Sequence, residues 1–195
     1  MSERHRHFVL YKPDGCLSQF VSQQTKRKNK QMLGHLFDFP SGTMAIGRLD
    51  EPSEGLLLLT TDGKVSEHVR SSEVEKEYYA QVDGNISDSE IEKLSTGVTI
   101  STDGGPYTTK PCVVRKLDAT PLLPPRQKKI RDERHGPTSW ISITLTEGKY
   151  RQVRKMTAAV GHPTLRLVRV RIGNIRIGSM KPTDVVEVDG FSTGI

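Results

Sequence analysis

The apolar residues of this chain fall into short runs separated by turn-forming residues, a pattern typical of a sheet-rich protein. It predicts extended segments at 8–11, 17–21, 44–46, 56–61, 76–82, 98–105, 108–117, 139–146, 164–172 and 185–188. Asp103 and Gly104 form the expected turn of a hairpin, and Pro111 favours an edge position for 108–117. Residues 139–146 alternate between apolar and polar side chains, which predicts a half-buried strand.

Segment 164–172 has a slip in this alternation. Its apolar residues stand at odd positions up to Leu167 and at even positions from Val168 onward. A β-bulge at Leu167-Val168 would reconcile the two halves, because one extra residue reverses the face of every later side chain. With such a bulge, Arg166 lies opposite the earlier leucines, and Arg169 and Arg171 lie on a polar face.

Other segments carry the signals of helices. Asp62 is the expected N-cap of a helix that ends near residue 70, and Ser87 with Glu90 has capping-box spacing for a helix at 88–95. Residues 150–160 predict a third helix that Gly161 ends, and 32–37 predict one or two helical turns. Strands and helices together indicate an α+β fold.

Charge narrows the class of partner. The 195 residues suit one large domain or two small ones, and 29 Lys and Arg against 23 Asp and Glu give a net charge of +6. This excess suggests a polyanionic partner.

Cys16 and Cys112 form no C-x-x-C motif, and the six histidines are scattered without H-E-x-x-H, so neither a disulfide framework nor a metal site is expected. The N-terminus lacks the apolar stretch of a secretory signal, and no apolar run reaches the ~20 residues of a membrane helix, so a cytoplasmic protein is expected.

Two basic segments are candidates for contact with such a partner. Residues 22–31 carry four cations and no apolar residue, and 121–137 combine four prolines with five basic residues. Each segment is either a solvated loop or a loop that contacts phosphate groups. The repetition of basic segments favours the second interpretation.

Three short constellations are candidates for chemistry. Arg48 and Asp50 stand in a polar loop, 47–55, between two apolar runs, although a tight connection with a surface Arg–Asp pair would look the same. Lys76 and Tyr78 are two apart on a strand and share a face. In 148–155, Arg151 and Arg154 are expected on one helix face near its N-terminus. Cations there oppose the helix dipole, which suggests an anion to bind or else a solvated basic face.

These motifs, taken together and in order, resemble the RsuA-type family of bacterial RNA pseudouridine synthases. They are K-P at 12–13, G-R-L-D at 47–50, S-E-G-L-L-L-L-T at 53–60, K-E-Y at 76–78, E-G-K-Y-R-Q-V-R-K-M at 147–156 and G-H-P-T-L-R-L-V-R at 161–169. The likeness spans residues 8–188 and is greatest to the large-ribosomal-subunit subgroup E, which lacks an N-terminal S4 domain.

The resemblance implies a pseudouridine synthase fold, with a mixed, largely antiparallel sheet, flanking helices and a central active-site cleft. It implies one catalytic domain over 1–195 without an S4 domain, and two lobes are expected, at about 1–60 with 135–195 and at 61–134. It also implies no cofactor and no metal, a monomer, and 23S ribosomal RNA or a pre-ribosomal large subunit as partner.

The resemblance also assigns roles to residues. Asp50 matches the catalytic nucleophile, and Arg48 matches an arginine that holds the target nucleotide out of its helix. Tyr78 matches the tyrosine that packs on the uracil, Arg154 a basic residue that pairs with the aspartate, and Val153 an apolar wall of the pocket.

The remaining candidates are basic residues expected to contact RNA: Lys26, Arg27, Lys28, Lys30, Lys76, Lys128, Lys129, Arg131, Arg151, Lys155, Arg166 and Arg169. Two other functions compete with the synthase. A catalytically inactive RNA-binding assembly factor would be expected to have lost Asp50, Tyr78 or Arg154. A metal-dependent nuclease would need clustered carboxylates, whereas Glu51 and Glu54 are more simply turn and surface residues.

Overall fold

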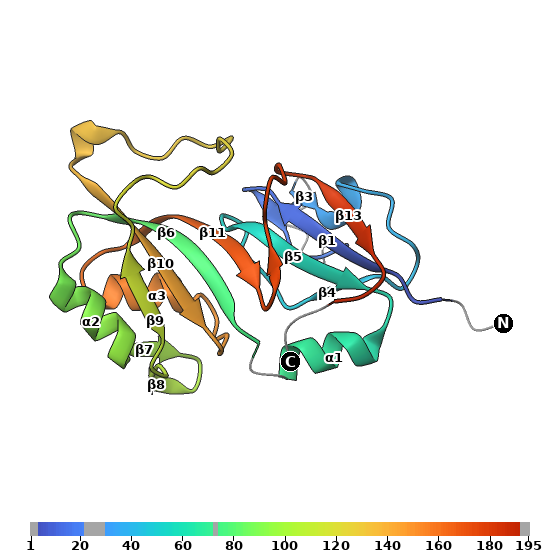
Figure 1. Cartoon of the computed structure of the whole chain (residues 1–195), viewed down its shortest axis with the longest axis horizontal. Helices are drawn as coiled ribbons and strands as arrows, with labels where there is room; N and C mark the ends of the chain where they lie inside the picture. Colours follow the sequence, from blue (N-terminus) through green and yellow to red (C-terminus); the bar gives the residue numbers. More distant parts are fainter. Residues whose placement is uncertain (1–3, 22–29, 72–73, 192–195) are drawn as a thin grey trace. The chain divides into compact units, whose positions relative to one another are not determined.

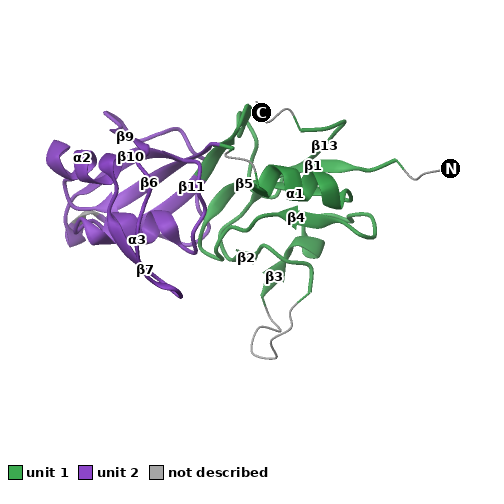
Figure 2. Ribbon diagram, turned by 90° about the horizontal axis from the view of Figure 1, so that it is seen from below, with its two compact units in different colours: residues 1–74, 169–195 green, residues 75–168 purple. Residues whose placement is uncertain are grey.

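The computed structural model describes residues 4–21, 30–71 and 74–191 (Figure 1). They form two compact units, which Figure 2 shows in green and purple. The first unit comprises 1–74 and 169–195, and the second comprises 75–168. Compared with the expected lobes, the first unit also takes in 61–74 and leaves 135–168 to the second.

The first unit is built on strands β1 and β5. Its strand order is β13-β1-β5-β11, where β11 is Thr164–Ile172, with β4 paired to β5 and β12 paired to β11. The register of β1 and β5 is antiparallel and matches His7 with Thr60 and Lys12 with Gly55. The elements of this unit are β1 (His7–Lys12), β2 (Cys16–Leu17), β3 (Gln31–Met32), a 3₁₀ helix (Leu33–His35), β4 (Met44–Ile46), β5 (Glu54–Thr60), α1 (Gly63–Ser71), β12 (Ile175–Arg176) and β13 (Val185–Val188).

The four consecutive leucines of β5 are explained by two apolar cores. Leu56 and Leu58 pack in one cluster with Val9, whereas Leu57 and Leu59 pack in another with Phe8. A strand that is buried on both faces needs an apolar residue at every position. The unbroken run is therefore the sequence signature of a central strand.

The second unit has the strand order β11-β6-β10-β9 and a separate hairpin. Eight antiparallel pairs join β6 to β10, from Lys76 with Leu145 to Asp83 with Thr138. Its elements are β6 (Lys76–Asp83), α2 (Asp88–Thr96), β7 (Thr99–Thr102), β8 (Gly105–Thr108), β9 (Val113–Lys116), a 3₁₀ helix (Glu133–His135), β10 (Thr138–Leu145) and α3 (Gln152–Ala159). Apolar side chains from β6 and β10 share one cluster with α2 and α3.

Strand β11 (Thr164–Ile172) shows where the alternation of apolar residues in 164–172 changes phase. It supplies 164–168 to the second unit and 169–172 to the first. Leu167 packs in the core of the second unit and Ile172 in a core of the first. The apolar side chains therefore change phase where the strand passes from one core to another.

Several local predictions are confirmed. The Ser87–Glu90 capping box is present, Asp62 accepts hydrogen bonds from the N–H groups of Lys64 and Val65, and the hairpin turns at 103–104. Residues 139–146 are not half-buried as predicted, because Trp140 is 8% exposed and Ser142 is 3% exposed on the second face. Among the described residues, no helix is long and apolar enough to cross a membrane.

Candidate active site

Asp50 lies in the loop that joins β4 to β5, within the first unit. Gly47 begins this loop with a φ of +71°, in a region of backbone conformation that favours glycine. The N–H of Ser53 donates a hydrogen bond of 2.9 Å to the carbonyl oxygen of Asp50, which closes a tight turn. The Asp50 side chain is half-buried.

The backbone is held on both sides of Asp50. The Ser18 hydroxyl donates to the carbonyl oxygen of Leu49 at 2.8 Å and accepts from its N–H at 3.0 Å. After Asp50, the carbonyl oxygen of Glu51 accepts from the Gly15 N–H at 2.9 Å and from Lys12 Nζ at 3.2 Å. The backbone is therefore held by hydrogen bonds on each side of Asp50.

Lys12 belongs to the K-P motif, but no role in supporting the Asp50 loop was predicted for it from the sequence. Its side chain is fully buried, and Nζ also donates to the carbonyl oxygens of Pro13 at 2.9 Å and Cys16 at 2.6 Å. Burial lowers the Lys12 pKa to about 8, although the neighbouring Cys16, Asp14, Glu54 and Asp50 act in the opposite direction. The available signal was a lysine placed between a buried strand and Pro13.

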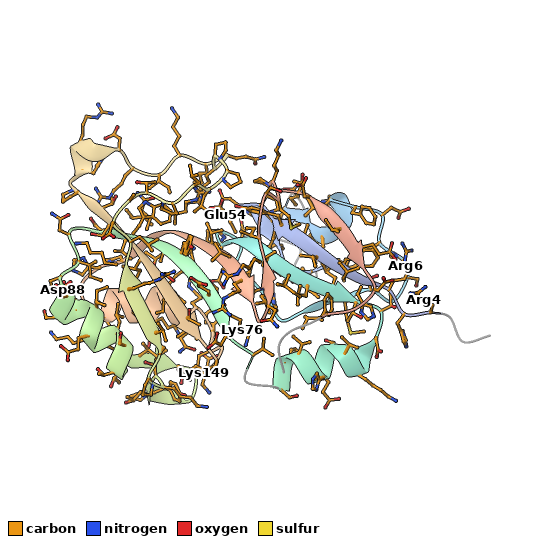
Figure 3. All side chains as sticks on the ribbon, in the orientation of Figure 1. Arg4, Arg6, Glu54, Lys76, Asp88 and Lys149 are labelled. Carbon is orange, nitrogen blue, oxygen red and sulfur yellow. The ribbon has the colours of Figure 1, made fainter. Side chains whose placement is uncertain are left out.

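The other charged residues of this loop have different environments. Arg48 is exposed, and its guanidinium group donates to Gln19 Oε1 at 3.3 Å. Glu51 forms an ion pair of 2.6 Å with Lys30. The prediction that Glu54 is a surface residue is wrong: it begins β5 and is 1% exposed (labelled in Figure 3).

The second unit holds the remaining candidates. Tyr78 on β6 is half-buried and packs against the apolar cluster that contains Val153 of α3. Lys76 Nζ donates to the Thr146 carbonyl oxygen at 3.4 Å, and the Arg154 guanidinium donates to that of Thr164 at 3.4 Å. The structure thus brings Tyr78 and Val153 to one cluster, whereas Asp50 belongs to the first unit.

Arg151 differs from its predicted position. Helix α3 begins at Gln152, and Arg151 precedes it with a left-handed backbone of φ +52° and ψ +34°. The prediction that Arg151 and Arg154 share a helix face is therefore wrong, because Arg151 is outside the helix. A non-glycine residue in this conformation is uncommon and is found preferentially at functional or tightly constrained positions.

Three arginines proposed as RNA contacts are held by internal carbonyl groups. Arg166 and Arg169 are buried, and they donate to the carbonyl oxygens of Pro124 and Leu56 at 2.7 and 2.8 Å. The expected polar-facing position of Arg169 is wrong for this reason. Arg131 binds Asp83 and the carbonyl oxygens of Gly136 and Pro137.

The predicted lysines of the second unit are more accessible. Lys128 and Lys129 are exposed in the long connection before β10, and Lys155 is partly exposed on α3. Lys30 of the first unit is also exposed. Lys26, Arg27 and Lys28 lie outside the described residues.

The second unit also contains a pocket of about 1120 Å³, lined in part by Thr120 and Arg131 of the long connection before β10, which sequence reasoning missed. Arg131, Arg134 and Arg166 are among the residues that line it, together with Trp140. Arg131 and Arg134 form ion pairs with Asp83 and Asp132. These contacts compensate part of the positive charge of the pocket.

Comparison with known proteins identifies the class. A family model described as RNA pseudouridylate synthase matches residues 6–159, and a structure titled "Crystal structure of pseudouridylate synthase" superposes with a TM-score of 0.74 and 25% identity, covering 94% of this chain and 70% of that one. The chain belongs to the RNA pseudouridylate synthase family and has the expected α+β fold. It is an RNA pseudouridine synthase.

Two relatives carry a more particular name. A protein of Xanthomonas campestris pv. campestris named ribosomal large subunit pseudouridine synthase E is 43% identical over 89% of this chain and 90% of its own length. A protein of Vibrio parahaemolyticus with the same name is 37% identical over 95% of this chain and 75% of its own length.

Proposed function

We propose that this enzyme converts a specific uridine of 23S ribosomal RNA, in the large subunit, to pseudouridine, with Asp50 as its nucleophile. The names of the Xanthomonas and Vibrio relatives support the large-subunit substrate. The observation that carries the assignment of Asp50 is the double attachment of its loop, through Ser18 on one side and through Lys12 and Gly15 on the other. Such support is expected for a carboxylate that must be aimed at one atom.

The reaction is an isomerisation and needs no co-reactant. The bond from ribose C1′ to uracil N1 breaks, a bond from C1′ to C5 forms, C5 loses a proton and N1 gains one. A carboxylate near C1′ suits this chemistry, as in retaining glycoside hydrolysis. Asp50 is proposed for that carboxylate, Arg154 for a basic partner of it, and Val153 for an apolar wall, as the resemblance to the family implies.

The target base must first leave its helix, which costs a few kcal/mol. Arg48 holds the displaced nucleotide, and its exposed position at the Asp50 loop is suited to this. Stacking of the uracil on Tyr78 offsets part of the cost, since base–aromatic stacking contributes about 1–3 kcal/mol. Tyr78 also assists removal of the C5 proton.

The protein acts as a monomer and binds RNA through phosphate contacts. The accessible cations proposed for these contacts are Lys30, Lys76, Lys128, Lys129, Arg151 and Lys155. Lys26, Arg27 and Lys28 are proposed from their sequence alone. Arg131 and Arg166 fix the backbone at either end of the segment that carries Lys128 and Lys129, and Arg131, Arg166 and Arg169 contribute positive potential.

The test compares Asp50→Asn with Glu51→Gln, a matched removal of the neighbouring carboxylate. Each variant is incubated with 23S ribosomal RNA labelled with tritium at C5 of uridine, and tritium release is measured. Asp50→Asn should release none while its RNA affinity stays within a few-fold, and Glu51→Gln should stay within a few-fold of the unsubstituted enzyme.

Mapping of all pseudouridine positions in ribosomal RNA, from cells with and without the protein, identifies the target uridine. Turnover by Asp50→Asn would rule out its role as nucleophile. RNA binding by the unsubstituted protein without any tritium release would favour the inactive assembly factor.

A further inference from the structure

Tyr150 is an exposed aromatic residue in the turn between β10 and α3. The residue is 69% exposed, which is unusual for a ring of this size. Lys155 Nζ lies 5.3 Å from the centroid of the Tyr150 ring, and Lys149 Nζ lies 4.6 Å from that of Tyr107 (Lys149 is labelled in Figure 3). The Tyr150 ring thus meets a cation, and most of its surface stays accessible to a ligand.

The backbone around Tyr150 is fixed by a network that centres on Glu147. Glu147 accepts hydrogen bonds from the Tyr107 hydroxyl at 2.5 Å, the Lys110 N–H at 2.8 Å and the Gln152 side-chain amide at 2.6 Å. Gln152 in turn accepts from the Lys149 N–H at 2.8 Å. A ring on a fixed backbone loses less conformational entropy when a ligand stacks on it.

The surroundings of Tyr150 are basic. Lys149 and Arg151 are its neighbours in sequence, Lys155 faces its ring, and Lys110 joins the same network through its N–H. Glu147, the carboxylate of that network, is engaged by three hydrogen bonds. Lys155 is itself held by a hydrogen bond of 2.7 Å from Nζ to the Ser101 carbonyl oxygen. An open aromatic face among fixed cations is the arrangement that binds single-stranded nucleic acid, where bases stack and phosphates meet positive charge.

We propose that Tyr150 stacks on an unpaired base of the RNA, and that Lys149, Arg151 and Lys155 bind the phosphates beside that base. The basic–aromatic surface formed by Tyr107, Lys110, Lys149, Tyr150, Arg151 and Lys155 then contacts RNA apart from the target uridine. This inference rests on the proposed function for its partner. It adds a base contact to the phosphate contacts of Arg151 and Lys155. Bases within a duplex are stacked on one another, so the surface selects single strands.

The test measures the affinity of fluorescein-labelled (rA)12 and (rU)12, and of a 12-base-pair RNA duplex, by fluorescence anisotropy. Tyr150→Leu keeps an apolar side chain but removes the ring, and it should weaken single-strand binding at least fivefold. Tyr150→Phe keeps the ring and should stay within twofold. Neither Tyr150 variant should change duplex affinity more than twofold. Lys149→Met should weaken the binding of both single-stranded and duplex RNA and reduce the salt dependence of binding.

Equal single-strand affinity of Tyr150→Leu and the unsubstituted protein would overturn the proposal, as would equal losses for single strand and duplex. Because Tyr150 is exposed, Tyr150→Leu should keep the fold, and melting followed by circular dichroism checks this. If Tyr150→Leu does not fold, Tyr150→Ser replaces it in the test. The assay needs no turnover. A protein that binds single strands through Tyr150 but releases no tritium would therefore contradict only the proposed function.

Discussion

The ammonium group of Lys12 donates a hydrogen bond of 3.2 Å to the carbonyl oxygen of Glu51, the residue that follows Asp50. Lys12 thereby joins the end of β1 to the loop of the proposed nucleophile. The same burial that fixes this contact lowers the Lys12 pKa to about 8. A charge supports the loop, and its desolvation makes the folded state sensitive to pH.

We expect this sensitivity to appear as a gain of stability at alkaline pH. A lysine in the unfolded chain keeps its proton up to about pH 10.4, whereas native Lys12 loses it near pH 8. Between these values the unfolded state binds more protons, so the free energy of unfolding rises with pH. Relative to Lys12→Met, the unsubstituted protein should gain up to about 3 kcal/mol between pH 7.5 and 10.5.

Urea denaturation at several pH values measures this difference. Lys128→Met, at an exposed position, is the matched control for removal of a lysine charge. A difference between the unsubstituted protein and Lys12→Met that stays constant across the range would show that Lys12 does not titrate there.

Ser18→Ala should reduce turnover more than RNA affinity. The substitution removes both hydrogen bonds to Leu49 and leaves a buried N–H and carbonyl group without that partner, at a cost of about 1–3 kcal/mol. The backbone before Asp50 is then less constrained, and we expect kcat to fall roughly tenfold or more, with Kd for RNA within twofold. Ser41→Ala, at an exposed position, is the control. Unchanged kcat in Ser18→Ala would mean that this attachment is not needed for catalysis.

Local signals were enough to predict much of the fold. The consecutive leucines of β5, the Ser87–Glu90 capping box and the Asp103-Gly104 turn depend on neighbours in sequence, and the structure has all three. The position of Asp50 in a loop between two strands was also predictable, because apolar runs enclose it. Its role as nucleophile remains a prediction.

The features that were missed depend on distant parts of the chain. Glu54 is buried by its place in β5, and Trp140 by coverage of the second face of β10, where its carbonyl oxygen also accepts from the Leu117 N–H. Arg169 is buried because its guanidinium reaches the Leu56 carbonyl oxygen, 113 positions away in sequence. The periodicity within one segment does not show which distant segments bury it. Secondary-structure propensity likewise does not predict the left-handed conformation of Arg151.

Gly55→Ala should destabilise the protein more than Gly42→Ala. Both glycines have positive φ, +103° and +81°, so both alanines are strained. A Cβ at Gly55 would also meet the backbone of Arg169, whereas at Gly42 it would find open space. We expect about 1 kcal/mol for Gly42→Ala and more than about 2 kcal/mol for Gly55→Ala, as measured by urea denaturation. Equal losses would argue against close packing of β5 on β11.

Glu90 should contribute to acid sensitivity. Hydrogen bonds from the Ser87 N–H and hydroxyl lower the Glu90 pKa to about 2, and His162 acts in the same direction. A carboxylate with a depressed pKa stabilises the fold above its unfolded value, near 4.3, and this contribution disappears as pH falls toward 2. The difference in melting temperature between the unsubstituted protein and Glu90→Gln should therefore shrink between pH 5 and 2.5. Glu92→Gln, on the same helix, is the comparison, and an undiminished difference would contradict this linkage.

Glu147 should be the most sensitive position of the network behind Tyr150. Glu147→Ala removes the acceptor of three hydrogen bonds, whereas Tyr107→Phe removes one of them and Gln152→Ala another. Hydrogen bonds to a charged acceptor stabilise the fold more than bonds between neutral groups, so the loss of all three in Glu147→Ala should lower the free energy of unfolding by more than either other variant. Because Glu147 and Gln152 fix the Lys149 backbone, Glu147→Ala should also weaken single-strand RNA binding, although it removes a negative charge. Removal of a negative charge by itself should increase RNA affinity. An increase in RNA affinity for Glu147→Ala would therefore show that the network does not position this surface.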